Sequence, residues 1–339
     1  MAGYTPGETT VHTSVADIGR VTRALRKTSR PVVLVPTMGA LHEGHLELVR
    51  AAKSLPRAVV VVSIFVNPLQ FGDDADLDTY PRTLEADVEK LRGVGVELVF
   101  APSVREMYPN GFRTTVSAGP LSGELEGASR PGHFDGALTV CLKLFNVTNC
   151  SDAVFGEKDY QQLVLMQQLV TDLNLPIQLH SVPVIREKDG LAMSSRNVRL
   201  DSTARQAAVA LSAALTLGAH CGDRGPGAVL SGARSVLEVV PEVEVDYLEL
   251  RDGRLAPLPE NFGEGEARLL VAARVGGVRL LDNVGVILGD LQARQEREIA
   301  QAALQAAGLE AELTDGEMAE LRRLRDEVRR VREGRNMPG

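Results

Sequence analysis

Length, composition and charge place the chain among globular proteins of ordinary make-up. It has 339 residues, enough for two domains, with 44% hydrophobic and 24% charged residues. A formal net charge of −8 argues against a surface that coats nucleic acid. No run approaches the ~20 apolar residues of a membrane span, which argues against a membrane protein.

The cysteines and the N-terminal residues indicate the cellular compartment of the protein. The three cysteines form no spaced motif. The first residues lack the basic and apolar regions of a signal peptide. Since an odd, sparse set of cysteines fits a reducing compartment, we expect a cytoplasmic protein.

The chain begins with elements that lead to one buried strand. Residues 1–12 are predicted to form a loose arm, and residues 15–27 a short helix. Three of the four residues 32–35 are β-branched, which predicts a strand buried on both faces. Pro36 cannot donate to a sheet ladder, so we expect the strand to stop there. Apolar residues at helical spacing then predict a helix that begins near Gly44.

The turn between this strand and helix has the make-up of an anion site. Gly39 and Gly44 let a ligand approach the backbone closely. The first turn of the helix offers unpaired N–H groups and a partial positive charge. His42 and His45 lie at the same point, three residues apart, and share one face if the turn is helical.

Two other interpretations of the histidines are a zinc site and a purely local structural role. His-Glu-Gly-His is one residue short of the zinc-protease pattern, and no nearby Cys/His cluster supplies further ligands. We therefore expect no metal site formed by the protein alone. For a single histidine the structural role would be preferred, but two of the chain's six at one corner favour function.

A second buried strand is predicted over residues 58–66, and amide side chains follow its end. Asn67 and Gln70 lie just past the carboxyl end of that strand, where open α/β sheets bind ligands. Asn-Pro is also a common turn opener, so the ligand-binding and structural interpretations carry equal weight here. Residues 72–79 form an acidic loop, which we expect to be solvated and able to help hold a cation.

The following stretch continues an alternating pattern of helices and strands. We expect helices over residues 82–91 and 137–147, and strands over residues 96–100, 113–117 and 153–155. Residues 119–135 are rich in glycine and irregular. A long loop in a compact domain is more often functional than idle.

Two further segments have the chemistry of phosphate contacts. Residues 156–162 form a second strand–glycine–helix corner with Lys158, a point charge suited to phosphate. Asp159 could instead serve only as a helix N-cap. After a predicted strand over residues 177–185, interrupted at Pro183, residues 193–197 join two hydroxyls to a guanidinium. Taken alone, this last segment is more simply interpreted as a polar linker.

Beyond residue 197 the pattern changes from alternating to segregated elements. Helices are predicted over residues 201–217 and 228–239, and strands over residues 243–250, 268–275 and 278–281, the last two joined as a hairpin by Gly276-Gly277. The fold class is therefore α/β, with a Rossmann-like parallel-sheet domain (1–185), a smaller α+β domain (186–289) and a charged helical tail (290–339).

Six segments in order carry a resemblance to a known family. They are PTMGALHEGHL, FVNPLQF, YPRT, RPGHF, FGEKDYQQ and MSSRN. This set resembles the pantothenate synthetases, the pantoate–β-alanine ligases of the nucleotidyltransferase superfamily. The resemblance covers roughly residues 11–287, and nothing is carried over to the tail.

The resemblance implies a two-step reaction. Pantoate carboxylate attacks the α-phosphorus of ATP, which gives pantoyl adenylate and pyrophosphate. The amine of β-alanine then attacks the acyl carbon, which gives pantothenate and AMP. The family also implies Mg²⁺ on the ATP phosphates and a homodimer, with neither nucleic acid nor membrane as a partner.

Site residues follow from the motif match. The implied catalytic residues are His45, His42 and Lys158. The implied ATP-binding residues are Met38, Gly39, Ala40, Leu41, His42, Glu43, Gly44, His45, Gly156, Glu157, Lys158, Asp159, Ile185, Met193, Ser194, Ser195 and Arg196. The implied pantoate- and β-alanine-binding residues are Gln70, Gln162 and Asn67. Arg130 and His133 fit the family pattern without an assigned role, and Asp87 is a candidate for contact with Mg²⁺ or its waters.

Two rival functions stay open at this point. One is another nucleotidyltransferase of the same superfamily, which the histidine corner alone does not exclude. Gln70, Gln162 and the following α+β region favour the ligase. The other is a non-catalytic nucleotide-binding module that uses the tail for interactions, against which the full set of polar residues argues.

Overall fold

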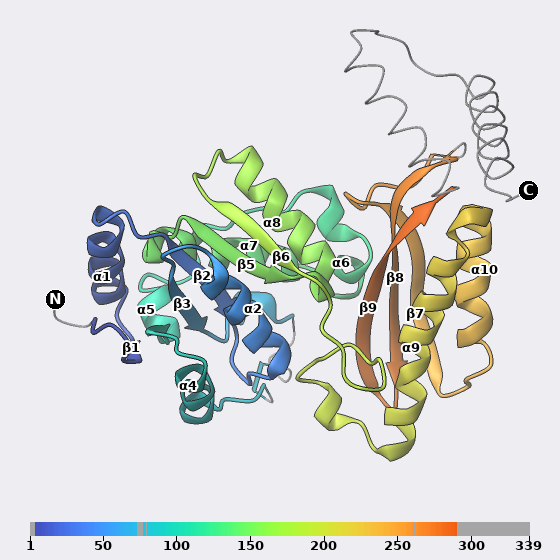
Figure 1. Cartoon of the computed structure of the whole chain (residues 1–339), viewed down its shortest axis with the longest axis horizontal. Coiled ribbons are helices and arrows are strands. Elements are labelled where there is room, and N and C mark those ends of the chain that lie inside the picture. Colours follow the sequence, from blue (N-terminus) through green and yellow to red (C-terminus); the bar gives the residue numbers. More distant parts are fainter. Residues whose placement is uncertain (1–3, 73–76, 79, 260–261, 290–339) are drawn as a thin grey trace, which may run out of the picture.

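The structure is a computed structural model that describes residues 4–72, 77–78, 80–259 and 262–289. Two sheets lie side by side, each with its own helices (Figure 1). The first has six strands in the order β1-β4-β3-β2-β5-β6, and the second has three in the order β7-β8-β9. This arrangement confirms the predicted α/β class with a parallel sheet followed by a smaller α+β region. The tail at 290–339 and most of the acidic loop lie outside the described residues.

All strand pairs in the first sheet are parallel. Its strands are β1 (Thr10–His12), β2 (Val32–Thr37), β3 (Val59–Ile64), β4 (Leu98–Phe100), β5 (Asp152–Gly156) and β6 (Gln178–Val182). The connecting helices are α1 (Val15–Lys27), α2 (Glu43–Ser54), α4 (Leu84–Gly93), α5 (Val104–Met107), α6 (Glu126–Ser129), α7 (His133–Thr148) and α8 (Tyr160–Asp172).

Strand β2 is buried on both faces, as its β-branched run predicts. Val32 and Leu34 pack in one apolar cluster with residues of α1, α7 and α8. Val33 and Val35 pack in another with residues of α2 and α4. All four side chains are fully buried. The carboxyl end of β2 therefore lies in the middle of the sheet, where the predicted anion site with His42 and His45 begins.

Pro36 does not end β2, contrary to the prediction. The Thr37 carbonyl accepts from the Phe65 N–H at 3.0 Å, so the bonding groups of Thr37 face β3. Alternate residues of a strand face opposite neighbours, so Pro36 faces β5. Pairing with β5 ends at Leu34, and no ladder bond is required of the proline there. The strand continues to Thr37 along β3 alone.

Two other predictions near the sheet edge are wrong. The predicted loose arm contains a strand, because residues 10–12 pair with 98–100 of β4. Residues 113–117 form no strand. Their backbone is held by α7 instead: the Val116 N–H donates to the Thr139 hydroxyl at 2.8 Å. Partners that are distant in sequence decide the conformation of both segments, and the sequence of a short polar segment does not show which partners it will meet.

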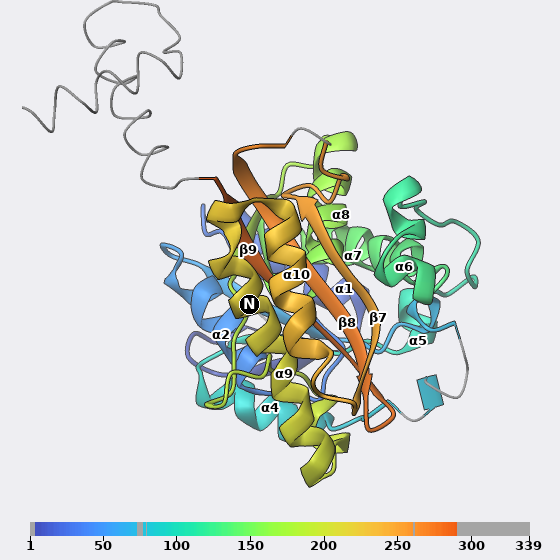
Figure 2. The same cartoon turned by 90° about the vertical axis from the view of Figure 1, so that its right-hand side faces the viewer.

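The second sheet is antiparallel and lies under two helices (Figure 2). Its elements are α9 (Ser202–His220), α10 (Pro226–Leu237), β7 (Val243–Asp252), β8 (Gly265–Val275) and β9 (Val278–Leu288). The predicted hairpin is confirmed at Gly276 and Gly277, which have φ of +56° and +77°. Positive φ at both positions matches the twist of two-residue hairpins. The strands run longer than predicted.

Contacts between the two sheets bring β7–β9 against the segments that follow β5 and precede α7. Arg268 on β8 pairs with Glu157 at 2.7 Å, and Arg251 on β7 pairs with Glu124 at 3.0 Å. The Tyr160 hydroxyl donates to the Gly253 carbonyl at 2.9 Å. Among the described residues, no helix is both long and apolar enough to cross a membrane.

Candidate active site

The loop between β2 and α2 is held in shape from α4. Gly39 and Ala40 have left-handed φ of +86° and +50°. The fully buried Asp87 carboxylate accepts from the N–H groups of Ala40 at 2.9 Å and Leu41 at 2.8 Å. The Lys90 ammonium donates to the Leu41 carbonyl at 2.6 Å. Both oxygens of Asp87 thus fix the loop, a different use from the metal contact considered above.

His42 and His45 meet at the start of α2. Their ring centroids are 4.0 Å apart. The backbone N–H of His42 donates to His45 Nδ1 at 3.2 Å. Since a neutral imidazole has one donor and one acceptor nitrogen, the proton of His45 is on Nε2. A Cβ at Gly44 would lie 2.9 Å from His42 Cε1, so only glycine leaves room for this ring.

Both imidazoles are neutral at pH 7. Burial lowers the pKa of His42, and the charges of Lys158 and Lys90 lower it further. Burial, followed by the neighbouring His42, lowers the pKa of His45 to about 3. Without substrate the pair can therefore donate hydrogen bonds but carries no charge. An anion bound beside them favours the charged form and raises their pKa values.

A second wall of the site begins after β5. Residues Glu157–Asp159 form one turn of 3-10 helix that leads into α8. Asp159 occupies the N-cap position of α8 but makes no capping hydrogen bond, and its carboxylate lies 3.3 Å from Lys158 Nζ. Desolvation opposes ionisation of Asp159, but the charges of Lys158 and Arg196 outweigh it and hold its pKa below the usual value.

A cleft of about 250 Å³ opens between these two walls and the segment after β6. Most of the residues expected at the site line it. They are Met38, His42, Gly44, His45, Gln70, Gly156, Lys158, Asp159, Gln162, Ile185, Met193, Ser194, Ser195 and Arg196. Segments separated by more than a hundred residues thus meet in one cavity at the carboxyl ends of β2 and β5, where open α/β sheets bind ligands.

Three of the remaining expected residues are engaged in other contacts. Glu43 pairs with Arg50 on α2. Glu157 pairs with Arg268. Asn67 is fully buried, and its Nδ2 donates to Gln70 Oε1 at 3.1 Å. Asn67 therefore lies behind Gln70 and supports it, while Gly39, Ala40 and Leu41 form the backbone of the loop held by Asp87.

The chain is similar to known proteins along most of its length. The family pattern described as pantoate-beta-alanine ligase matches residues 10–285. The chain belongs to this family. It is 62% identical over 286 residues to pantothenate synthetase of Corynebacterium jeikeium, covering 84% of this chain and 92% of that protein. Family membership decides against both rival functions: the ligase catalyses the ATP-dependent condensation of pantoate with β-alanine.

Solved structures of the family share the fold. Pantothenate synthetase of Thermus thermophilus is 44% identical, with a TM-score of 0.74 over 81% of this chain and 98% of that one. Pantoate-beta-alanine ligase of Francisella tularensis, solved with beta-gamma ATP and beta-alanine, is 34% identical, with a TM-score of 0.67. It covers 81% of this chain and 97% of that one.

The cleft of the ligase has polar residues to which sequence reasoning gave no role. His133 Nδ1–H donates to the Gln70 carbonyl at 2.8 Å, and Arg130 Nη2 donates to the same oxygen at 3.4 Å. Burial, followed by the Arg130 charge, lowers the pKa of His133 to about 4. Burial raises the pKa of Tyr80, whose hydroxyl lies near Ser195. The RPGHF and YPRT segments were the available signal for these three residues.

Proposed function

We propose that this cleft forms pantoyl adenylate and then transfers the pantoyl group to β-alanine. In the first step a pantoate oxygen bonds to the α-phosphorus of ATP, and pyrophosphate leaves. In the second, the β-alanine nitrogen bonds to the acyl carbon, loses a proton, and AMP leaves with the bridging oxygen. Adenylation demands positioning and neutralisation of developing negative charge more than covalent help from the protein.

The observation that carries this proposal is the pair of contacting histidines at the helix start, in the same cavity as Lys158. His45 Nε2–H is a donor, because its Nδ1 already accepts from the backbone. We assign both histidines and Lys158 to the phosphates, where they stabilise pyrophosphate as it leaves. Burial that keeps the imidazoles neutral prepares them to gain charge only when the polyphosphate is present.

The other ATP contacts come from the segments that line the rest of the cleft. We assign Ser194, Ser195 and Arg196 to the phosphates on the side opposite His45. We assign Gly156 and Asp159, which line the same cleft, to the ribose. Ile185, which is partly buried against the apolar cluster of α2, is assigned to the adenine ring.

Pantoate is assigned to the amides and apolar side chains that line the cleft. Gln70 and Gln162 line this cavity together with Phe65, Val140 and Leu144. Amides can bind the carboxylate and hydroxyls of pantoate, and the apolar side chains suit its methyl groups. Asn67 holds Gln70 in place from behind.

Magnesium fits this site as an ion carried by the nucleotide. Among the described residues, no group of three His, Cys, Asp or Glu side chains is arranged to hold a metal. Asp159 is the carboxylate of the cleft that could contact an ion on the phosphates, and the net lowering of its pKa keeps it charged for that role. The ion would neutralise part of the phosphate charge as pyrophosphate departs.

We further propose that two copies of the chain form a homodimer in the cytosol. We also propose that residues 1–185 and 186–289 are separate domains. Each sheet has its own apolar core, and all three cysteines are unpaired and buried, which suits a reducing compartment. Closure of the second domain would protect the adenylate from water. Analytical ultracentrifugation that finds only a monomer at micromolar concentration would contradict the dimer.

The test of the reaction is ATP–pyrophosphate exchange in the presence of Mg²⁺ and the absence of β-alanine. The proposal expects exchange only when pantoate is added, because pyrophosphate can return to ATP only from an adenylate. Exchange without pantoate, or none with pantoate in protein that completes the whole reaction, would contradict the adenylate step.

A further inference from the structure

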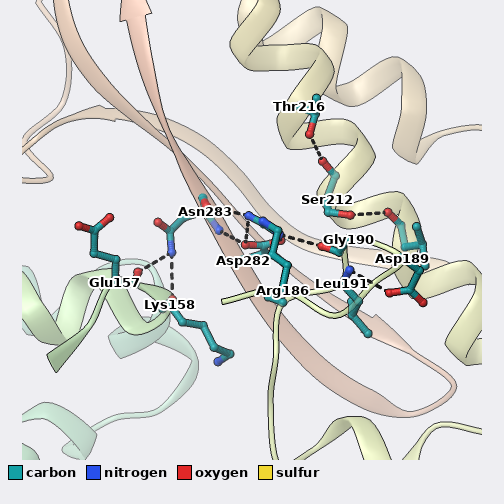
Figure 3. A network of polar contacts seen from close by, with 12 residues as sticks. Glu157, Lys158, Arg186, Asp189, Gly190, Leu191, Ser212, Thr216, Asp282 and Asn283 are labelled. Atoms are coloured by element: carbon teal, nitrogen blue, oxygen red, sulfur yellow. Dashed lines mark hydrogen bonds and ion pairs between the residues drawn. The ribbon is translucent and has the colours of Figure 1, made fainter. Parts of the chain in front are cut away.

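Asn283, on β9 of the second sheet, makes direct contact with the turn that carries Lys158. The residue is 2% exposed. Its amide Nδ2 donates to the backbone carbonyls of Glu157 and Lys158, both at 2.9 Å (Figure 3). The Lys158 side chain leaves the same turn in the direction away from β9 (Figure 3). Asn283 thus binds the backbone of Lys158, the lysine assigned to the phosphates, although the two residues are more than a hundred positions apart in the sequence.

The orientation of the Asn283 amide is fixed by its neighbour Arg268. Arg268 Nε donates to Asn283 Oδ1 at 2.8 Å, and a guanidinium can only donate. The oxygen must therefore face Arg268, which leaves both Nδ2 hydrogens for the two carbonyls. Arg268 is itself held by Glu157 at 2.7 Å and lies 3.9 Å above the Tyr160 ring.

The preceding residue, Asp282, connects the same point of β9 to the segment after β6 that also lines the cleft. Asp282 Oδ1 accepts from the Asn283 backbone N–H at 2.7 Å. Its carboxylate also receives two hydrogen bonds from Arg186, at 2.6 and 3.0 Å. Arg186 Nη1 donates further to the Gly190 carbonyl at 3.0 Å, in the turn that precedes residues 193–196. Asp282 and Asn283, adjacent on β9, therefore hold both the turn that carries Lys158 and the segment that leads to residues 193–196.

We propose that Asn283 is a positioning residue for adenylation, which acts by holding the 157–159 turn so that Lys158 points at the ATP phosphates. This inference rests on the proposed role of Lys158. A lysine has a flexible four-carbon stem, so its contact with phosphate depends on where the backbone holds its Cα. A turn of three residues makes few bonds of its own, and the Asn283 amide supplies two.

The test is a double-mutant cycle between Asn283 and Lys158, measured by pantoate-dependent ATP–pyrophosphate exchange. Asn283→Ala removes two hydrogen bonds to partly buried carbonyls, which predicts a fall of about 10- to 100-fold in kcat/KM for ATP. If Asn283 acts through Lys158, the double variant is no slower than Lys158→Ala within about threefold. The matched control is Asn146→Ala, which removes an exposed amide bonded to the Leu142 carbonyl at 2.9 Å and leaves the rate unchanged.

A second readout separates positioning from general loosening of the fold. Binding of ATP weakens more in Asn283→Ala than binding of adenosine, which lacks the phosphates assigned to Lys158, whereas a generally loosened fold weakens both equally. Asn283→Asp serves as a second variant if the alanine variant does not fold, since it keeps the shape and the Arg268 contact but places an oxygen against the carbonyls. We expect it to reproduce the pattern of the alanine variant.

Each outcome of the cycle has one meaning. Losses that multiply in the double variant, equal weakening of adenosine and ATP, or a normal rate in both Asn283 variants overturn the inference. A normal rate in Lys158→Ala overturns instead the proposed role of Lys158. The two failures are thus distinguishable.

Discussion

Replacement of Asp87 should loosen the loop that presents the histidine pair. This carboxylate accepts from the N–H groups of Ala40 and Leu41 and from the Thr83 hydroxyl at 2.9 Å. It is fully buried, so no water replaces it readily. The two N–H groups belong to the loop whose Gly39 and Ala40 have positive φ.

The size of the effect follows from the groups left without an acceptor. Each buried donor deprived of its partner costs about 1–3 kcal/mol. Asp87→Ala leaves the N–H groups of Ala40 and Leu41 without an acceptor, so the free energy of unfolding should fall by about 2–6 kcal/mol, twice the cost of one donor. Asp87→Asn keeps the shape but offers one acceptor oxygen in place of two, and should lose about 2–3 kcal/mol.

Urea unfolding of these variants measures the loss, with Glu89→Gln as the matched control. Glu89 lies on the same helix and is exposed. It pairs with Arg92 at the surface, so the loss of stability in Glu89→Gln should stay within about 0.5 kcal/mol. A loss below about 1 kcal/mol for Asp87→Ala would refute the anchoring role. If Asp87 instead held the metal, Asp87→Asn would chiefly raise the Mg²⁺ concentration needed for half-maximal rate.

Three further predictions concern the histidine corner and the pantoate end. His45→Ala should slow single-turnover adenylation by roughly 10²–10⁴, and a near-normal rate would remove its assigned role. Because the pKa of His45 is lowered to about 3 in the folded state, the unfolded chain binds more protons between about pH 3 and 6.5. The free energy of unfolding should therefore be highest above pH 6.5. It should decrease as the pH drops through that window, by at most about 1.4 kcal/mol per pH unit for this group. Between pH 7 and 5, the free energy obtained from unfolding curves should decrease less in His45→Ala than in the unchanged protein. Gly136→Ala would bring a Cβ to 2.1 Å from the Leu69 carbonyl oxygen. It should therefore shift the turn that carries Gln70 and raise KM for pantoate. Gly123 has open space around it, so Gly123→Ala should leave KM for pantoate unchanged.

Sequence patterns located the elements and corners where local chemistry is strong. The β-branched run of β2 predicted a strand buried on both faces, and residues 15–27 form the expected helix. The histidine corner was found because glycines, a strand end and a helix start coincide within ten residues. These features depend on neighbours in sequence, so local patterns are enough to predict them.

Features that depend on distant partners were not predicted. Pro36 stays in its strand because β5 no longer pairs beside it, and residues 10–12 become a strand because β4 lies next to them. Asp87 on its helix gives no sign that its partners are the N–H groups of a loop more than forty residues earlier. Tertiary pairing decides such cases over local propensity.

The Asp282-Asn283 step was missed for a related reason. Asp282 and Asn283 are adjacent polar residues in the middle of a largely apolar strand, which is a signal of buried hydrogen bonding. The sequence does not show which groups they meet. Only the fold brings Asn283 to the carbonyls of Glu157 and Lys158.

The most direct test of the adenylate mechanism follows one oxygen atom. Pantoate labelled with ¹⁸O in both carboxylate positions is condensed with β-alanine and ATP, and the AMP is analysed by mass spectrometry. We expect one ¹⁸O in each AMP, because the pantoate oxygen that attacked the α-phosphorus leaves with it. AMP without the label would contradict adenylation and require a different activated form of pantoate.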